Sequence, residues 1–420
     1  MNIVYTYASQ IWNVGCSFLC SILAARMLGQ TGQGDLALYT GFVALVTMII
    51  SVGLPSGFVH YIAARKLERQ VCFPIMLWVI PIGLSLVGLF IFIFPQTIFT
   101  QTLLPEKVLG RTTWKFLLLV HAGMTLLFGM LSALLQSEQA FKKNALTSVV
   151  GSTSLLLFYA AYYFQWIPIS WHAFYWIQLS LLLVVSLQSS IFLRQLYQLQ
   201  PDYFRWKWPS SLDWKPLLFF SMLAFFTNLI QFFNYKMDIW FIHYYTKENG
   251  QLGVYALAVL LTQMLWLLPN AVQTVVYAEY SQQSNRVLLW QRCRQASLSL
   301  LGYAFLAGAI LYFIAPFLLQ WFYGQEFVDA LPILRLLVWG IAPFSVTMTI
   351  SAYFSGTHRV RISLYASLLG FLVCLLLDIF LIPSHGITGA AYASVFSYLA
   401  STIYFVIQFI LDKNRIAVEH

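Results

Sequence analysis

The chain has 420 residues, of which 60% are hydrophobic and 9% are charged, and its formal net charge is +9. Soluble domains average roughly 45–50% apolar and about 25% charged residues, so this composition excludes a water-soluble enzyme domain. The basic residues are scattered over short connections and form no single run, which argues against a nucleic-acid partner.

Hydropathy predicts an all-α membrane protein with about a dozen spanning helices. A helix needs roughly 20 apolar residues to cross a hydrocarbon layer about 30 Å thick, so the spans use nearly the whole chain and leave no room for a catalytic domain. The N-terminus lacks the basic segment and cleavage site of a removable signal peptide. The predicted spans are 4–27, 35–64, 72–95, 114–136, 144–164, 172–193, 216–245, 252–278, 294–318, 331–354, 362–383 and 387–411.

The first span carries a polar stripe. Gln10, Asn13 and Ser17 recur at helical spacing and continue to Ser21. We expect this face to line a substrate path, with hydrogen bonds to the cargo. The alternative is that small polar side chains simply join helices, as they commonly do in membranes.

The first connection and the second span contain residues that suit a moving part. Arg26 and Asp35 bracket the connection, where they form either a salt bridge that closes the helical hairpin or a gate. Pro55 in the second span and Pro269 in the eighth each remove a backbone hydrogen bond and bend a helix. Matching bends suit a rocking mechanism, and the alternative is a static shape.

Two histidines and four aromatic residues are candidates for binding roles. His60 and His121 are single polar residues in apolar helices. We interpret them as packing residues, and the alternative is that they carry protons. Most aromatic residues belong to the membrane belt or the core. The candidates for stacking against a sugar ring are Trp12, Tyr39, Trp240 and Tyr255.

The seventh span is the least apolar and carries the strongest candidate site. Thr227, Gln231, Asn234 and Asp238 form one stripe, which matches the first-span stripe at an offset of 217 residues. An ionisable group inside a bilayer costs roughly 2.5–3.5 kcal/mol on insertion scales, so Asp238 and Lys236 are functional candidates by default. We expect both stripes to face one central cavity, and Lys236 or Asp238 to contact substrate or a coupling ion. The alternative is a structural pairing with neighbours.

Later spans add two charged candidates. Arg335 begins the tenth span as an interface anchor or a gating residue. Asp378 lies deep in the eleventh span and is a weaker candidate for coupling to H⁺ or Na⁺. No spacing typical of a metal site occurs, so neither a metal nor a cofactor is expected. The cysteines are interpreted as packing residues: Cys16, Cys20, Cys72, Cys293 and Cys374.

The two halves of the sequence resemble each other. Five matches in register predict two six-helix repeats, and because six is even both repeats enter the membrane in the same sense. The expected domains are a bundle at 1–196, a linker at 197–215, a second bundle at 216–411 and a tail at 412–420. The matched positions are Gly32-Gln33 with Gly250-Gln251, Tyr39 with Tyr255, Thr47 with Thr262, Pro55 with Pro269, and Ser137 with Ser355.

The charge bias of the connections predicts the orientation. If the N-terminus is cytoplasmic, the inner connections hold sixteen of the 23 Lys and Arg residues and the outer connections hold six. The positive-inside rule therefore places both termini in the cytoplasm.

Several short motifs follow one another along nearly the whole chain. They are LAARMLG at 23–29, GQGDLALY at 32–39, GLP at 53–55, NYKMD at 234–238, GVY at 253–255, FYG followed by EF at 322–327, and LIP followed by GITGAA at 381–391. Together they resemble Wzx-type polysaccharide or O-antigen flippases of the multidrug/oligosaccharidyl-lipid/polysaccharide (MOP) exporter superfamily, and the order of the motifs is more specific than any one of them. The chain departs from the family pattern at Asp378 and His60.

This resemblance implies a lipopolysaccharide-type export function in the bacterial inner membrane. An undecaprenyl-pyrophosphate-linked oligosaccharide would pass from the cytoplasmic to the periplasmic leaflet by ion-coupled alternating access. Lys236 and Arg26 could pair with the pyrophosphate. The implied partners are the lipid-linked oligosaccharide, membrane lipid, a glycan polymerase and a chain-length regulator, with a monomer as the working unit.

Three alternatives remain. A multidrug antiporter of the same superfamily would favour acidic cavity residues, which Lys236 and Arg26 oppose. A membrane glycan polymerase or ligase would carry a large outer loop, whereas no outer connection here exceeds about twenty residues. A major-facilitator permease would carry a different motif after the second span, where this chain has Arg65-Lys66-Leu67-Glu68-Arg69.

Overall fold

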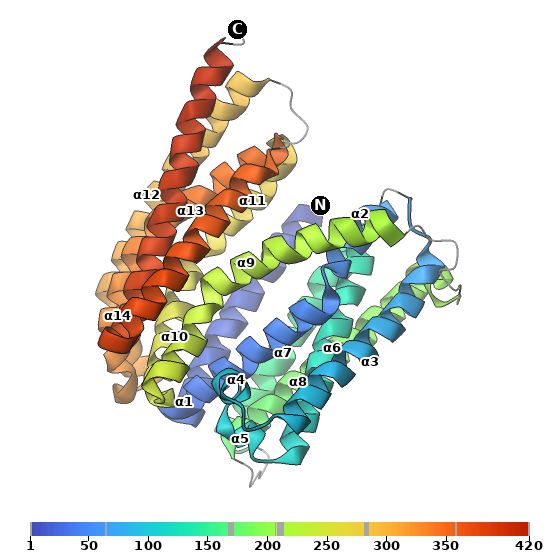
Figure 1. The fold of residues 1–420 in the computed structure, drawn as a ribbon, viewed down its shortest axis with the longest axis vertical. Coiled ribbons are helices and arrows are strands. Elements are labelled where there is room, and N and C mark those ends of the chain that lie inside the picture. Colours follow the sequence, from blue (N-terminus) through green and yellow to red (C-terminus); the bar gives the residue numbers. More distant parts are fainter. Residues whose placement is uncertain are drawn as a thin grey trace. The chain divides into compact units, whose positions relative to one another are not determined.

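The structure is a computed structural model that describes residues 2–63, 65–166, 172–205, 207, 214–280, 285–357 and 359–418. Every regular element in these ranges is a helix (Figure 1), which confirms the predicted all-α class. Two compact units divide the chain, Met1–Leu229 and Ile230–His420, and the boundary falls inside α9. We call them the N-terminal unit and the C-terminal unit.

The N-terminal unit holds the first six predicted spans and the first half of α9. Its elements are α1 (Asn2–Ser51), α2 (Leu54–Ala63), α3 (Arg69–Ile93), α4 (Ile98–Leu103), α5 (Glu106–Leu109), α6 (Thr112–Ser137), α7 (Phe141–Tyr163), α8 (Ala173–Leu199), the 3₁₀-helix η1 (Pro201–Phe204) and the start of α9 (Trp214–Thr246).

The C-terminal unit holds the rest of α9 and the remaining spans. Its further elements are α10 (Asn249–Gln263), the 3₁₀-helix η2 (Met264–Trp266), α11 (Leu267–Tyr280), α12 (Arg286–Leu318), the π-helix η3 (Leu319–Tyr323), the 3₁₀-helix η4 (Gln325–Asp329), α13 (Ala330–Gly356) and α14 (Val360–Val418).

Ten helices of the described ranges are long and apolar enough to cross a membrane, so the chain is a multi-pass membrane protein. Two of them are much longer than one span. Helix α1 leaves helical geometry at Gly29 (φ 63°), and α14 does so at Gly386 (φ 55°). Helix α14 therefore contains two of the predicted spans, while α1 contains the first predicted span and the start of the second, which continues into α2. This agrees with the prediction of about a dozen spans.

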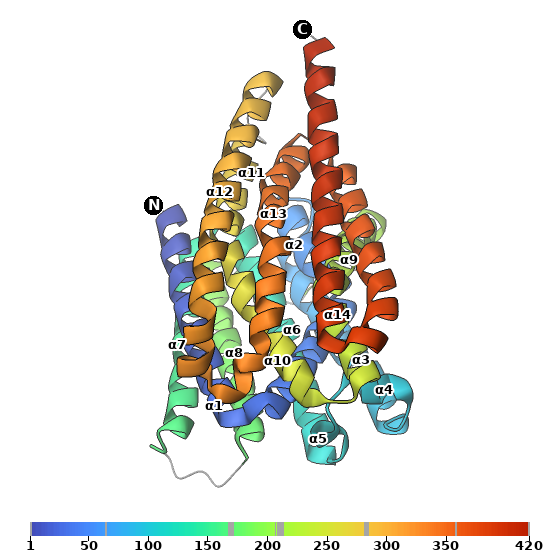
Figure 2. The same ribbon diagram turned by 90° about the vertical axis from the view of Figure 1, so that its left-hand side faces the viewer.

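One helix lies at the centre of each unit. Helix α6 packs against α1, α2, α3 and α8, while α13 packs against α10, α11, α12 and α14. Figure 2 shows α12, α13 and α14 side by side. Helix α13 buries most of its residues, and α6 buries about half of those in its apolar stretch. Helix α6 ends at Ser137 and α13 ends one residue after Ser355. These two serines are matched repeat positions, which agrees with the two-bundle arrangement.

Helix α9 begins as part of the N-terminal unit. Between α1 and α2 the backbone turns at Gly53 (φ 71°), and a Cβ atom there would lie 2.1 Å from the backbone oxygen of Ser221 on α9. Only glycine allows this approach, so the first turns of α9 pack directly on the break. The predicted bundle limits at 197–215 remain a prediction, and residues 206, 208–213 and 419–420 of the predicted linker and tail lie outside the described ranges.

Candidate functional site

The C-terminal unit contains a cavity of about 200 Å³ among α9, η2, α11, α13 and α14. Its lining combines amide and hydroxyl side chains with aromatic rings, and none of these residues carries a charge at neutral pH. The lining residues are Gln231, Asn234, Tyr235, Trp266, Asn270, Gln273, Phe344, Thr347, Met348, Ser351, Ser367, Ser401 and Phe405.

The break before α11 explains how one span supplies three lining residues. Helix α10 tightens into the 3₁₀ turn η2, and Pro269, which lacks a backbone N–H, is the third residue of α11. Trp266, Asn270 and Gln273 follow at helical spacing on either side of Pro269 and all line the cavity. The predicted bend at Pro269 therefore has a local consequence, while its role in rocking stays a prediction.

Four aromatic rings form a packed cluster at the cavity. The Trp266 ring centroid lies 5.4 Å from that of Tyr235, 5.5 Å from that of Phe344 and 5.8 Å from that of Tyr398. The Phe344 and Tyr398 centroids are 4.8 Å apart. Because each ring is held by the others, the rings of Tyr235, Trp266 and Phe344 give the cavity a rigid apolar wall.

Asp238 is buried beside the polar stripe of α9 without lining the cavity. Its side chain is 5% exposed and accepts hydrogen bonds from the Tyr255 hydroxyl and from the backbone N–H of Ile239 at 2.9 Å. The Tyr255 hydroxyl also lies 3.2 Å from the Ser394 Oγ on α14. The carboxylate thus joins α9, α10 and α14 of one unit.

Asp378 is a second buried carboxyl group in the same unit. It is fully buried, the Cys374 thiol donates to its Oδ2 at 3.6 Å, and its Oδ1 has no hydrogen-bond partner in the described part of the chain. Asp238 and Asp378 also interact electrostatically. Asp238 and Asp378 are thus two buried carboxyl groups of the same unit.

Lys236 is half-buried and interacts electrostatically with Asp238. The described residues include no ion pair between Lys236 and Asp238. Of the predicted seventh-span site, the structure brings Gln231 and Asn234 to the cavity and buries Asp238 behind it. Thr227 bonds only to the backbone oxygen of Leu223, and it belongs to the N-terminal unit.

The first-span stripe lies partly exposed on the N-terminal unit. Gln10 and Ser17 are exposed, and the Ser152 hydroxyl of α7 donates to the Asn13 Oδ1 at 2.8 Å. The Trp12 indole N–H donates to the Thr153 hydroxyl, also on α7, at 2.9 Å. Asn13 and Trp12 therefore help to join α1 to α7.

The candidate gating residues have identifiable neighbours. Asp35 is buried and pairs with Lys107 of α5 at 2.7 Å, and the Lys107 ammonium lies 5.5 Å from the centroid of the Phe174 ring. Arg335 is half-buried, with its guanidinium 4.6 Å from the centroid of the Tyr312 ring. Arg26 is exposed on α1. Pro55 is the second residue of α2, directly after the break at Gly53.

The matched tyrosines of the two repeats are both buried, but their hydroxyl groups have different partners. Tyr39 is buried and its hydroxyl lies 2.7 Å from the His121 Nδ1 within the N-terminal unit, while Tyr255 pairs with Asp238 in the C-terminal unit. Neither tyrosine lines the cavity, and Trp240 is buried away from it. His60 is exposed on α2 and stacks on Phe220 with ring centroids 4.5 Å apart, so its interpretation as a packing residue stays a prediction.

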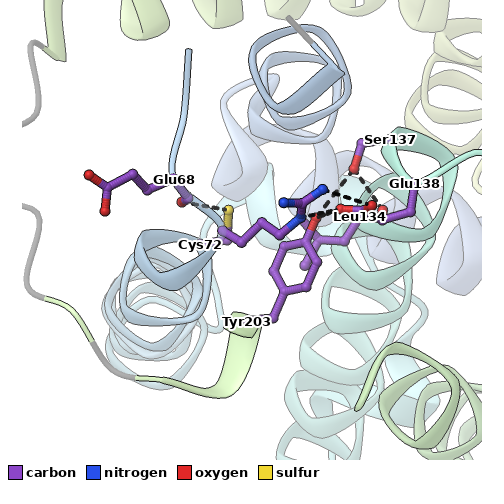
Figure 3. Close-up of polar contacts among 7 residues, drawn as sticks. Glu68, Cys72, Leu134, Ser137, Glu138 and Tyr203 are labelled. Carbon is purple, nitrogen blue, oxygen red and sulfur yellow. Dashed lines mark hydrogen bonds and ion pairs between the residues drawn. The ribbon is translucent and has the colours of Figure 1, made fainter. Parts of the chain in front are cut away.

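A polar cluster at one end of the N-terminal unit joins three chain segments (Figure 3). Glu138, directly after α6, accepts two hydrogen bonds from the Arg69 guanidinium, at 2.6 and 3.0 Å, and one from the Tyr203 hydroxyl at 2.7 Å. Burial opposes ionisation of Glu138, but these bonds outweigh it and hold the pKa of its carboxyl below the ordinary value. Asp412 of α14 accepts in the same way from the Tyr353 hydroxyl at 2.7 Å and from Arg359.

Most of the cavity lining was not predicted from the sequence, because the predicted binding stripes lie on the first and seventh spans only. Asn270 and Gln273, three positions apart, and Thr347 and Ser351, four apart, are also polar stripes at helical spacing and could have been found. Ser367 follows Ser363 by four positions, and Ser401 follows Ser394 and Ser397 at helical spacing, so both also carried a sequence signal. In the described residues no group of three or more His, Cys, Asp or Glu side chains could hold a metal ion.

Comparison with known proteins places these features in a family. The model described as "Polysaccharide biosynthesis protein" matches residues 1–277, and the MatE model matches residues 224–380. No curated protein matches the sequence.

Similar solved structures share the fold along nearly the whole chain. An inward-facing multidrug resistance MATE family transporter of the MOP superfamily superposes with a TM-score of 0.72 at 16% identity over 98% of this chain and 95% of that chain. The lipid II flippase MurJ, inward closed, gives 0.70 at 17% identity over 99% and 89%. A MOP superfamily transporter from Pyrococcus furiosus gives 0.58 at 16% identity over 99% and 95%. The chain therefore belongs to the polysaccharide biosynthesis protein family and has the fold of the MOP superfamily, a class of transporters and flippases and not of enzymes.

Proposed function

We propose that the protein turns an undecaprenyl-pyrophosphate-linked oligosaccharide from the cytoplasmic to the periplasmic leaflet of a bacterial inner membrane. The family match over residues 1–277 and the fold shared with a lipid II flippase support a glycan carrier. The surplus of basic residues in alternate connections supports cytoplasmic termini.

The uncharged cavity of the C-terminal unit carries this proposal. A cationic drug would need a carboxylate at its binding surface, because a charge moved out of water without a counter-charge is strongly disfavoured. The described lining residues offer amides, hydroxyls and aromatic rings instead. Those groups complement the hydroxyls and the apolar faces of a sugar.

Asp238 and Asp378 are proposed as the coupling groups. Both are buried near one another in the unit that contains the cavity. Asp238 also lies one helical turn beyond Asn234, which lines the cavity. Protonation of this pair, or binding of Na⁺, would therefore alter the packing of α9 next to the cargo. Lys236 and Arg26 are proposed to pair with the pyrophosphate.

The multidrug antiporter is the second candidate. The MatE match over residues 224–380 and the two buried carboxyl groups favour it. The two functions separate cleanly in cells, since an antiporter protects a drug-hypersensitive host and a glycan flippase restores surface glycan.

Substitutions in the native host test the proposal. Lys236→Ala and Asp238→Ala are each expected to reduce surface glycan and to cause accumulation of the lipid-linked precursor, with normal protein level in the membrane. Glu106→Ala, on the exposed surface of α5, is the control and should retain full display. Full glycan display in both test variants would remove the proposed site, and drug resistance without any change in glycan would favour the antiporter.

A further inference from the structure

We infer that the cavity of the C-terminal unit is a subsite for one uncharged sugar ring of the cargo, and that it discriminates against uronic acids and free amino sugars. This inference rests on the proposed function, since it names the part of a glycan that the unit holds.

The size of the cavity limits what it can take. Pockets for drug-sized ligands measure roughly 300–1,000 Å³. The cavity measures about 200 Å³ and therefore suits a single ring-sized group, whereas an oligosaccharide or a polyprenyl chain would not fit inside it.

One wall of the cavity offers an apolar ring surface. Trp266 is 8% exposed, packs between Tyr235 and Phe344, and lines the cavity. Its indole N–H is fully buried, so what Trp266 offers to a ligand in the cavity is the surface of its ring. Such a ring surface can stack against the apolar face of a sugar.

The remaining walls offer further neutral groups. Asn234 accepts from Ser397 through its Oδ1 at 2.7 Å. In the described part of the chain, its amide nitrogen makes no hydrogen bond. The same is true of the side chains of Gln273 and Ser367. Together these groups supply both donors and acceptors from α9, α11 and α14. Such a set matches the alternating hydroxyl groups around a sugar ring, with the ring face against Trp266.

The absence of charge from the described lining sets the specificity. A carboxylate or an ammonium group on the sugar would leave water and meet only neutral partners. Neutral hexoses and N-acetylated hexosamines carry no such charge, so their hydroxyl and amide groups exchange water for protein partners of the same kind.

Glycoside binding to the purified full-length protein in lipid nanodiscs tests the inference. The probes are methyl glucoside, methyl N-acetylglucosaminide, methyl glucuronide and methyl glucosaminide. Binding of each probe is measured by titration with saturation-transfer NMR. At least one neutral glycoside is expected to bind saturably. The two charged glycosides are expected to bind with an affinity at least about tenfold lower. Equal or tighter binding of a charged glycoside, or no binding of either neutral one, would overturn the inference.

Two variants locate the site. Trp266→Phe replaces the indole by a smaller ring and so reduces the stacking surface, and binding of the neutral glycoside should weaken about three- to tenfold. Trp339→Phe, which alters an exposed tryptophan of α13, is the matched control and should bind as the wild type does. If Trp266→Phe fails a melting test for folding, Gln273→Ala takes its place with the same expected loss. Unchanged binding in the folded variant would contradict the assignment.

A parallel assay separates this inference from the proposed function. Wild-type protein that transports a lipid-linked glycan in vesicles but binds no neutral glycoside would overturn the subsite alone. Wild-type protein that transports no lipid-linked glycan would overturn the proposed function, whatever the glycosides do.

Discussion

Asp378 shows at the scale of single residues how position in the fold sets chemical behaviour. The carboxyl group is fully buried, and only the weak Cys374 thiol donor faces it in the described chain. A thiol cannot compensate a carboxylate charge in a dry site. Asp378 therefore needs a proton or a cation, and that requirement makes it a coupling candidate.

Asp378→Asn should uncouple transport from the ion gradient. The amide keeps the shape of the carboxyl group but neither titrates nor carries charge. We expect the stimulation of glycan transport by a proton or Na⁺ gradient to fall by about 5–150-fold, the usual range for two coupled sites. Initial rates in vesicles with and without each gradient measure this. Asp329→Asn, at an exposed position of η4, should behave like the wild type, and full gradient stimulation in Asp378→Asn would refute the role.

The ion pair of Glu138 should make the stability of the folded protein depend on pH. Its native-state pKa is held below the ordinary value by Arg69 and Tyr203. The cluster therefore stabilises the fold fully above the unfolded-state pKa of about 4.3, and this contribution is lost as the pH falls through the depressed native value. The difference in melting temperature between wild type and Glu138→Gln in detergent should be largest at neutral pH and shrink below about pH 4. A difference that stays constant down to pH 3 would contradict this account.

The break between α1 and α2 shows how elements constrain one another. Gly53 combines a positive φ with a position directly under the backbone of α9. A methyl group there would force α9 away from the break and require an unfavourable backbone conformation. This contact lies between segments more than 160 residues apart, so hydropathy gave no indication of it.

Gly53→Ala should lower the melting temperature and reduce the amount of folded protein. We expect a loss of at least about 1–3 kcal/mol, because backbone strain and overpacking act together. Gly129→Ala is the matched control, since a Cβ atom at Gly129 in α6 would meet no atom within 4 Å. Equal melting temperatures for the two variants would show that α9 does not press on Gly53.

The sequence was most informative about elements and least informative about contacts between them. Span positions follow from hydropathy, because each span must be apolar along its length. Two residues of the predicted α9 stripe, Gln231 and Asn234, line the cavity, and their role as substrate-binding residues stays a prediction. The partners of Asp238 could not be predicted, because Tyr255 and Ser394 come from helices whose packing depends on the whole unit.

At the scale of the whole molecule, two similar bundles have acquired different polar interiors. The matched tyrosines Tyr39 and Tyr255 occupy equivalent places, yet one pairs with His121 and the other with Asp238. The uncharged cavity, Asp238 and Asp378 lie in the C-terminal unit. The repeat explains the shared architecture, and the divergence of the second copy supplies the candidate cargo and ion sites.

The most direct measurement is transport of a fluorescent undecaprenyl-pyrophosphate-linked oligosaccharide across vesicles that contain only the purified protein. The account predicts that the glycan becomes accessible to an added glycosidase in the opposite leaflet, and that Asp238→Asn slows this appearance. Glycan that crosses no faster than in protein-free vesicles, while a cationic dye is expelled, would contradict it.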